Sequence, residues 1–122
     1  MEYRTHEHSP LTSIRIAPGA VIVSMKFDMP GCYVKLHSHS FDHWMHVIRG
    51  TVLISIDGAV SIKHAGEKYF VAAHKQHDVT PLSIDAEVEC VHEHDDIHPD
   101  KTDGGDGIPI EWLRRLTDTV DA

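Results

Sequence analysis

The stretch GCYVKLHSHSFDHWMHVIRG, from Gly31 to Gly50, places four histidines within ten residues: His37, His39, His43 and His46. Residues two apart on a β-strand point to the same side, so His37 and His39 are expected to share one face. The SFD segment that follows fits a tight connection, which would bring His43 back on the neighbouring strand. Three converging imidazoles suit a late first-row metal ion. Three separately hydrogen-bonded histidines on a polar face would show the same spacing, so spacing alone leaves both readings open.

A second group, His92, His94 and His98, repeats the same spacing. These residues begin at the end of an expected strand and run into an Asp-rich segment with no return strand. A solvated loop that binds metal weakly or not at all is the favoured interpretation, and a second metal site there stays open. His46 would fall on the opposite strand face from His43, which favours a surface or subunit-interface position.

The elements that must position these histidines read as β-strands. Short runs rich in β-branched residues are separated by turn signals, and Asp57-Gly58 between two alternating runs predicts a hairpin. Many short strands without an intervening helix predict an all-β sandwich or barrel. The expected strands cover residues 13–17, 20–27, 32–37, 44–48, 51–57, 60–64, 68–73, 78–84 and 86–92.

The two ends of the chain differ from this pattern. Residues 1–12 are polar and are expected to form a loose N-terminal arm, and residues 93–107 have little apolar content and predict a mobile loop. The segment 108–122 predicts a short amphipathic helix, because Pro109 suits a first helical turn and apolar residues follow at helical spacing. The whole of 1–122 is expected to be one domain with its barrel at 13–92.

Composition excludes several classes of function. With 122 residues, 41% hydrophobic and 25% charged, the chain has the make-up of one globular domain. A net charge of −8 argues against nucleic acid and anionic membranes as partners. No apolar run approaches the ~20 residues that span a bilayer, and the N-terminus shows no signal peptide. We therefore expect a cytoplasmic protein in which Cys32 and Cys90 are free thiols.

A glycine frame around the first histidine cluster resembles a known family. Gly31, five residues, His37-x-His39, three residues, His43, six residues and Gly50 resemble the first motif of the cupin superfamily, G-x5-H-x-H-x3,4-E-x6-G. The segment GEKYFVAAHKQH, from Gly66 to His77, keeps every offset of the second motif, G-x5-P-x-G-x2-H. Two residues depart from that motif: Ala72 stands in place of proline and His74 in place of glycine. The resemblance covers about residues 25–92 and implies a cupin barrel, also called a double-stranded β-helix or jelly roll.

The resemblance also implies a metal site, with His37, His39, His43 and His77 as its ligands. The usual glutamate ligand is His43 here, as in small four-histidine cupins that bind Mn, Fe or Cu. Imidazole in place of carboxylate makes the site more positive and shifts preference from Mn towards Fe, Cu, Ni or Zn. We expect one divalent transition metal, with coordination positions left for water or substrate.

Strand parity adds candidates for substrate contact or proton transfer. Tyr33 and Lys35 would share the face of His37 if the strand runs back without a bulge, and Cys90 and His92 would share a face of the last strand. A buried core position is the favoured reading for Cys90.

The function expected from the resemblance is that of a metal-binding cupin, a small mononuclear-metal enzyme of dioxygenase type acting on a small organic molecule. A redox-neutral lyase, decarboxylase or isomerase would use the same site as a Lewis acid. A non-catalytic module that binds metal or a small molecule is the third possibility, because the fold hosts both classes. Cupins of this size commonly dimerise, and the strand at 20–27 and the helix at 109–120 are the expected contacts.

Overall fold

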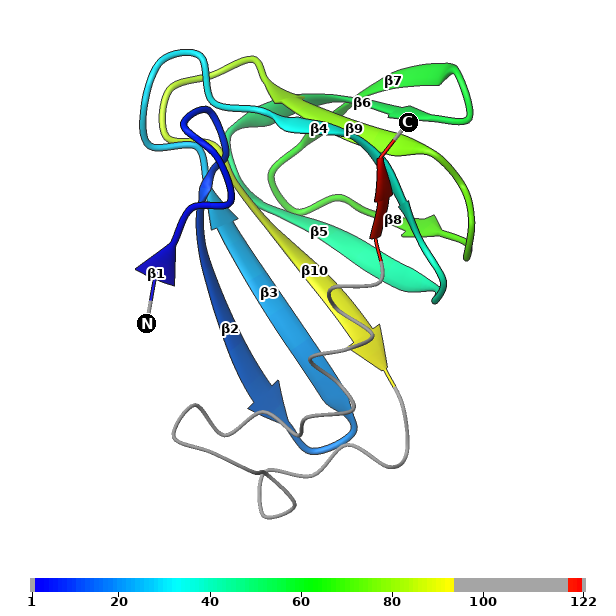
Figure 1. Ribbon diagram of the computed structural model, residues 1–122. Coiled ribbons are helices and arrows are strands. Elements are labelled where there is room, and N and C mark those ends of the chain that lie inside the picture. The colour runs from blue at the N-terminus through cyan, green and yellow to red at the C-terminus, as the bar shows by residue number, and fades with distance from the viewer. Residues whose placement is uncertain (1, 94–118, 122) are drawn as a thin grey trace.

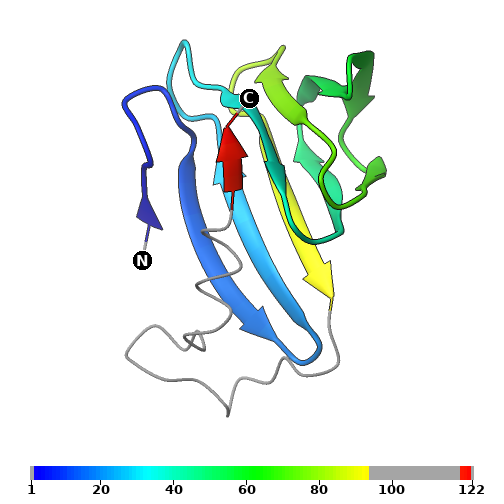
Figure 2. The same cartoon turned by 45° about the vertical axis from the view of Figure 1, so that its right-hand side comes forward.

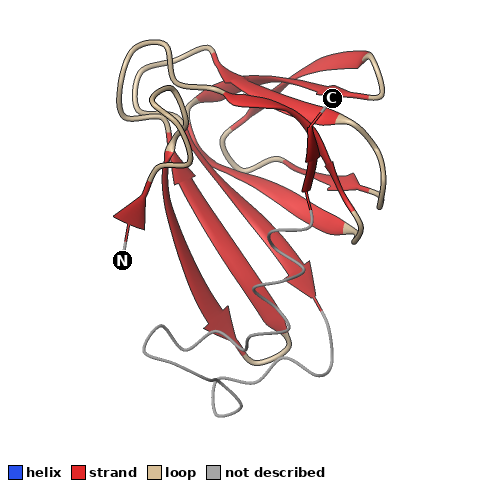
Figure 3. Ribbon diagram, in the orientation of Figure 1, coloured by secondary structure: helices blue, strands red, loops and turns tan. Residues whose placement is uncertain are grey.

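The computed structural model describes residues 2–93 and 119–121 and folds them into two antiparallel sheets that face each other (Figure 1, Figure 3). The first sheet has the order β1-β2-β3-β10-β5-β8, with strands Glu2–Tyr3, Leu11–Ala17, Ala20–Lys26, Glu87–Glu93, His43–Arg49 and Lys68–Val71. The second has the order β11-β4-β9-β6-β7, with strands Thr119–Asp121, Val34–His39, His77–Pro81, Thr51–Ile56 and Ala59–His64. No helix occurs in 2–93 or 119–121, so the predicted all-β fold is confirmed.

The core lies between the two sheets and is dominated by valine. The largest fully buried side chains are all valines, four from the first sheet and two from the second: Val21, Val47, Val71, Val88, Val52 and Val79. Branching at Cβ suits these side chains to the pleated surface, and each fully buried valine contributes on the order of 1.5–3 kcal/mol. Figure 2 shows β2, β3 and β10 side by side in one layer, while β4 and β11 lie in the other.

Side chains alternate along β5 as the sequence predicts. His43, Met45 and Val47 are buried, whereas Trp44 and His46 on the opposite face are only partly buried. This alternation places His43 on the inner face and His46 on the outer face, where it pairs with Lys68 of β8. Because β5 is regular, His43 and His46 lie on its opposite faces, as strand parity requires.

Two turns show why their residues are suited to them. Asp57 and Gly58 both have positive φ, 48° and 84°, as a two-residue hairpin between β6 and β7 requires, so the predicted hairpin is confirmed. Gly50 also has positive φ, 76°, and a Cβ atom there would collide with Ser83 Oγ and lie 3.1 Å from Ala86 Cα. The last glycine of the first motif is thus required by conformation and by space.

The N-terminal arm is more ordered than predicted. Residues 2–3 form β1 against β2, and β2 begins at Leu11 rather than at residue 13. The Arg4 guanidinium pairs with the Asp28 carboxylate, which lowers the pKa of Asp28. The arm is thus held by backbone pairing with β2 and by an ion pair with a residue far along the chain. Neither contact is signalled by the arm's own polar sequence.

The predicted C-terminal elements lie largely outside the described residues. The mobile loop expected at 93–107 is described only at Glu93, the last residue of β10. The helix expected at 108–122 is described only at Thr119–Asp121, and these three residues form β11 against β4 rather than helix. Among the described residues there is no helix that could cross a bilayer.

Candidate metal centre

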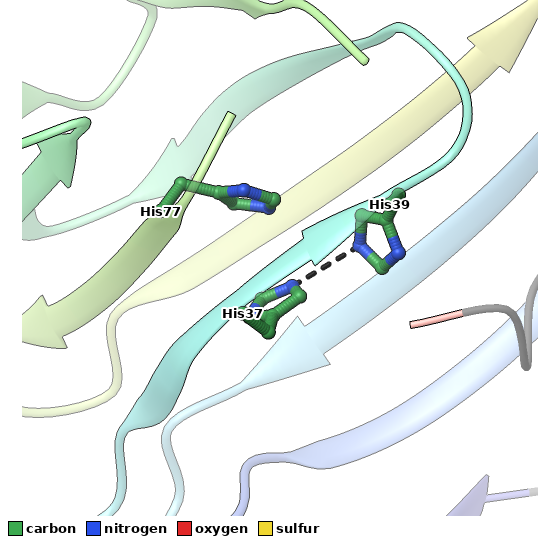
Figure 4. Close-up of side chains that lie close together, drawn as sticks. All are labelled: His37, His39 and His77. Carbon is green, nitrogen blue, oxygen red and sulfur yellow. Dashed lines mark hydrogen bonds between the residues drawn. The ribbon is translucent and has the colours of Figure 1, made fainter. Parts of the chain in front are cut away.

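Three histidines from two neighbouring strands of the second sheet converge at one point (Figure 4). His37 and His39 lie on β4, and His77 is the first residue of β9, where it is the direct antiparallel partner of His37. One ring nitrogen of each lies within 4.8 Å of those of the other two. The period-two spacing of β4 and the pairing of β4 with β9 thus bring together residues that are far apart in the sequence.

His43 reaches the same place from the opposite sheet. It is the first residue of β5 and is 2% exposed. Its ring centroid lies 5.3 Å from that of His39 and 5.0 Å from that of His77. The connection of residues 40–42 returns the chain as the sequence predicts and places His43 beside the three-histidine group, although His43 is not part of the set whose ring nitrogens lie within 4.8 Å of one another.

Backbone carbonyl groups set the tautomers of two of these histidines. His37 Nδ1 lies 2.6 Å from Lys35 O, and His77 Nδ1 lies 2.9 Å from Lys75 O. A carbonyl oxygen can only accept, so each Nδ1 carries the proton and each Nε2 keeps its lone pair. Hydrogen bonding of the second ring nitrogen to a carbonyl is the usual support for a metal-ligating histidine. The same support, from the residue two positions earlier, thus occurs on both strands.

The spacing of the nitrogen atoms fits a shared ion. His37 Nε2 and His39 Nε2 are 3.1 Å apart and make a hydrogen bond in this structure (Figure 4, dashed line). Two nitrogens each bound at about 2.0–2.1 Å to one ion in neighbouring positions would be roughly 2.8–3.4 Å apart, the shorter separation for an octahedral angle and the longer for a tetrahedral one. The observed separation lies in that range.

His43 provides the sharpest test of whether an ion fits. Both of its ring nitrogens are buried, and neither makes a hydrogen bond of regular geometry with a described residue. A buried polar atom left without a partner costs about 1–3 kcal/mol. A cation beside His37, His39 and His77 would give one of these nitrogens a partner, so the residues present fit a metal ion.

Burial keeps the histidines neutral. It lowers the pKa of His39 to about 2, of His43 to about 3 and of His77 to about 4. Loss of hydration is the largest cause in each case, and repulsion between neighbouring imidazoles adds to it. Neutral imidazole is the form that binds metal, so the site is in its binding form at neutral pH.

The turn before His77 accommodates both departures from the cupin motif. His74 occupies the motif's glycine position and has φ 67°, in the left-handed region that glycine favours. Its backbone N–H donates to His39 O at 2.7 Å, and Lys75 N–H donates to Ala72 O at 3.2 Å. Histidine therefore takes the backbone shape of the expected glycine, at some cost in strain.

The predicted pocket residues on β4 lie away from the cluster. The register of β4 against β9 shifts between Val34 and His37, so strand parity does not carry back from His37. Tyr33 precedes the strand and stacks on His8 of the N-terminal arm at 6.1 Å, and the side chain of Lys35 is exposed. The backbone carbonyl of Lys35, rather than its side chain, contacts the cluster.

The two candidates on β10 face inward. Cys90 is a buried free thiol in the hydrophobic core, and burial raises its pKa to about 12, in line with the favoured structural reading. His92 is also buried, with Nδ1 2.8 Å from Asp42 O and its ring 4.5 Å from that of Phe41. Its contacts are thus to the connection between two predicted ligands.

Sequence reasoning missed the residues of that connection. Phe41 is buried and stacks on His39, with ring centroids 4.8 Å apart and planes 18° apart. Asp42 Oδ1 accepts a hydrogen bond from Ala73 N–H at 2.7 Å. The sequence did offer one signal. Phe41 is an apolar aromatic residue in a three-residue turn between two predicted ligands, and exposed turns rarely hold such a residue, so its burial could have been predicted.

No family model matches the sequence, and no curated protein matches it. Solved structures with the same fold are nevertheless numerous. KdgF from Halomonas sp. superimposes with a TM-score of 0.66 at 20% identity, over 76% of this chain and 84% of that one. A cupin 2 conserved barrel domain protein from Rhodopseudomonas palustris gives 0.63 at 19% identity, over 76% and 69%.

A third similar structure is much longer than this chain. Oxalate decarboxylase from Bacillus subtilis gives a TM-score of 0.61 at 19% identity, over 75% of this chain but 27% of the decarboxylase. Identities this low show the arrangement of the strands and nothing about activity. Together with the two facing sheets and the histidines between them, these similarities show that the chain has the cupin, or double-stranded β-helix, fold.

Proposed function

We propose that this cupin binds one divalent transition metal through His37, His39, His43 and His77. The observation that carries the proposal is His43, a buried imidazole that lies beside the other three histidines and whose ring nitrogens make no hydrogen bond of regular geometry with a described residue. The fixed Nε2 lone pairs of His37 and His77 support it. A purely structural cluster would instead be expected to give each buried nitrogen a hydrogen-bonding partner.

The favoured activity is that of a small mononuclear-metal enzyme, dioxygenase-like, acting on a small organic molecule. When bound, Fe, Mn, Cu, Ni or Zn would supply Lewis acidity, and the redox-active ions among them would also supply electron transfer. The chain's own contribution would be to orient the ligands and limit water, because the buried Met45 and Val71 lie on the strands next to His43 and the buried Phe41 lies in the connection before it. No described residue is assigned a catalytic role.

A redox-neutral lyase, decarboxylase or isomerase is the second candidate. A protein titled oxalate decarboxylase shares the fold, which is consistent with such chemistry but does not transfer it to this chain. A non-catalytic module that binds metal or a small molecule is the third candidate. Uptake of O2 in the presence of small diketones or phenols would favour the first candidate. Consumption of an organic substrate without O2 uptake would favour the second, and neither O2 uptake nor substrate consumption would favour the third.

Assembly as a homodimer and a cytoplasmic location remain part of this proposal. The predicted contact strand β3 lies between β2 and β10, so its edges are already paired. A dimer that used β3 would have to bury the outer face of the first sheet rather than extend the sheet. Size-exclusion chromatography with light scattering would give the oligomeric state.

Metal content tests the proposal directly. Untagged wild type, His77→Ala and the matched control His46→Ala would be analysed by elemental mass spectrometry after incubation with each metal and desalting. We expect about one ion per chain in wild type and in the His46 variant, whose altered side chain faces away from the site, and none in the His77 variant. Wild type that retains no metal after incubation would refute the proposal.

A further inference from the structure

The connection of residues 40–42 joins two of the proposed ligands, His39 and His43, and it is held from two sides. On one side lies β10, which contributes His92. On the other lies the segment between β8 and β9, which leads to His77. The position of this connection therefore determines where the imidazoles of His39 and His43 lie relative to His77.

His92 holds the backbone of this connection. Its Nδ1 is 2.8 Å from the carbonyl oxygen of Asp42, so this nitrogen carries the proton and donates it. Asp42 is the residue directly before His43, and its carbonyl belongs to the peptide group that leads into His43. The hydrogen bond spans 50 residues of sequence and joins β10 to the start of β5.

His92 also supports the aromatic side chain of the same connection. Its ring centroid is 4.5 Å from that of Phe41, with the planes tilted by 52°. Phe41 in turn stacks on His39 at 4.8 Å with nearly parallel planes. Phe41 is thus packed between His92 and a proposed ligand, so moving His92 would change the support of the His39 ring.

The far side of the connection is fixed by two backbone donors. Ala73 N–H donates to the Asp42 carboxylate, and His74 N–H donates to His39 O, each at 2.7 Å. These bonds tie the connection to the segment that carries His77. His92 supplies the corresponding tie to β10, so the three bonds together set the position of the connection.

We propose that His92 is a positioning residue of the metal site, which acts through Phe41 and the Asp42 carbonyl on His39 and His43. This inference rests on the proposed function. It differs from the sequence-based expectation that His92 contacts substrate, and it assigns a role to an imidazole that lies outside the group of His37, His39 and His77. Partners of this kind typically change metal affinity by about 10–100-fold when they are removed.

Two substitutions separate the hydrogen bond from simple packing. His92→Phe keeps a ring against Phe41 but cannot donate to Asp42 O. His92→Asn loses the ring but keeps an amide N–H at about the position of Nδ1. The matched control is His46→Phe, the same change at a histidine on the outer face of β5. Zn2+ affinity of each protein would be measured at neutral pH by competition with a chromophoric chelator, with metal-free thermal unfolding measured in parallel.

We expect His92→Phe to weaken Zn2+ binding by about 10–100-fold. His92→Asn, which keeps the donated hydrogen bond, should retain most of the wild-type affinity. His46→Phe should bind like wild type. Equal affinities of wild type and His92→Phe would overturn the positioning role while leaving the metal site intact. An equal loss in both His92 variants would also overturn it, because the donated hydrogen bond would then not be the cause. Wild type without Zn2+ affinity would overturn the proposed function itself, and the positioning role with it.

Discussion

Replacing His43 by leucine should stabilise the metal-free protein while removing one of the proposed ligands. His43 is 2% exposed, and both ring nitrogens are buried without a hydrogen bond of regular geometry. The folded metal-free protein therefore bears a desolvation cost that the unfolded chain, with the same ring in water, does not. Leucine has nearly the same volume and no polar atom, so the substitution removes this cost with little change in packing.

The size of the effect follows from the two nitrogens. Each unsatisfied buried group costs about 1–3 kcal/mol. Part of the gain is lost because leucine fits a flat imidazole site imperfectly, so we expect a net increase of about 1–3 kcal/mol in the free energy of unfolding. For a chain of this length ~1 kcal/mol corresponds to ~4 °C in melting temperature, which gives an increase of roughly 4–12 °C.

Added metal should stabilise wild type more than it stabilises the His43→Leu protein. A ligand at a hundred times its dissociation constant stabilises the folded state by about 2.7 kcal/mol, and wild type should show this gain in full. The His43→Leu protein, with one ligand fewer, should gain less. The difference in stability between the two proteins should therefore shrink or reverse when metal is added.

The assay is urea unfolding followed by tryptophan fluorescence, after chelation and again with added metal. His46→Leu, on the opposite face of the same strand, is the control and should change stability by about 0.5 kcal/mol or less. A metal-free His43→Leu protein that is less stable than metal-free wild type would refute the reasoning. It would mean that the His43 nitrogens are satisfied in solution and that no desolvation cost is available for a metal to relieve.

Three further predictions concern the frame of the site. Gly50→Ala should destabilise the protein by about 2–4 kcal/mol in urea unfolding, because a methyl group would meet Ala86 Cα at 3.1 Å at a positive φ; a loss below 1 kcal/mol would contradict this. His74→Gly should raise stability by up to about 1 kcal/mol, since relief of the left-handed backbone exceeds the added chain entropy, and His74→Val is the opposite control. The metal-free protein should lose stability as pH falls below about 6.5. In the folded protein the pKa values of His39 and His77 are lowered to about 2 and about 4, so these side chains stay neutral, whereas in the unfolded chain they bind protons. Urea midpoints that stay constant from pH 7 to pH 5 would exclude this linkage.

Strand parity predicted the site wherever the strands are regular. His37 and His39 share a face of β4, and His43 and His46 take opposite faces of β5, as period-two spacing requires. Parity failed for Tyr33, because the register shift between Val34 and His37 interrupts the ladder. A register shift depends on the partner strand, so the sequence of one strand does not reveal it.

The hydrogen bonds that orient the proposed ligands and their neighbours could not be predicted from sequence patterns, for a different reason. The carbonyl of Lys35 and the carbonyl of Asp42 bind imidazoles, and every residue has such a carbonyl. Residue type therefore carries no signal for these contacts. His92 was predicted to share a face of its strand with Cys90, but its partner in the 40–42 connection follows only from the pairing of β10 with β5.

The short strand β11 has a practical consequence for any preparation of this protein. It pairs with β4 so that Asp121 lies opposite His37 and Thr119 lies opposite His39. A polyhistidine segment introduced next to β11 would thus add competing imidazoles within a few residues of two metal-binding candidates. Deletion of Thr119–Asp121 would instead expose the edge of β4, and unpaired strand edges tend to associate with other chains.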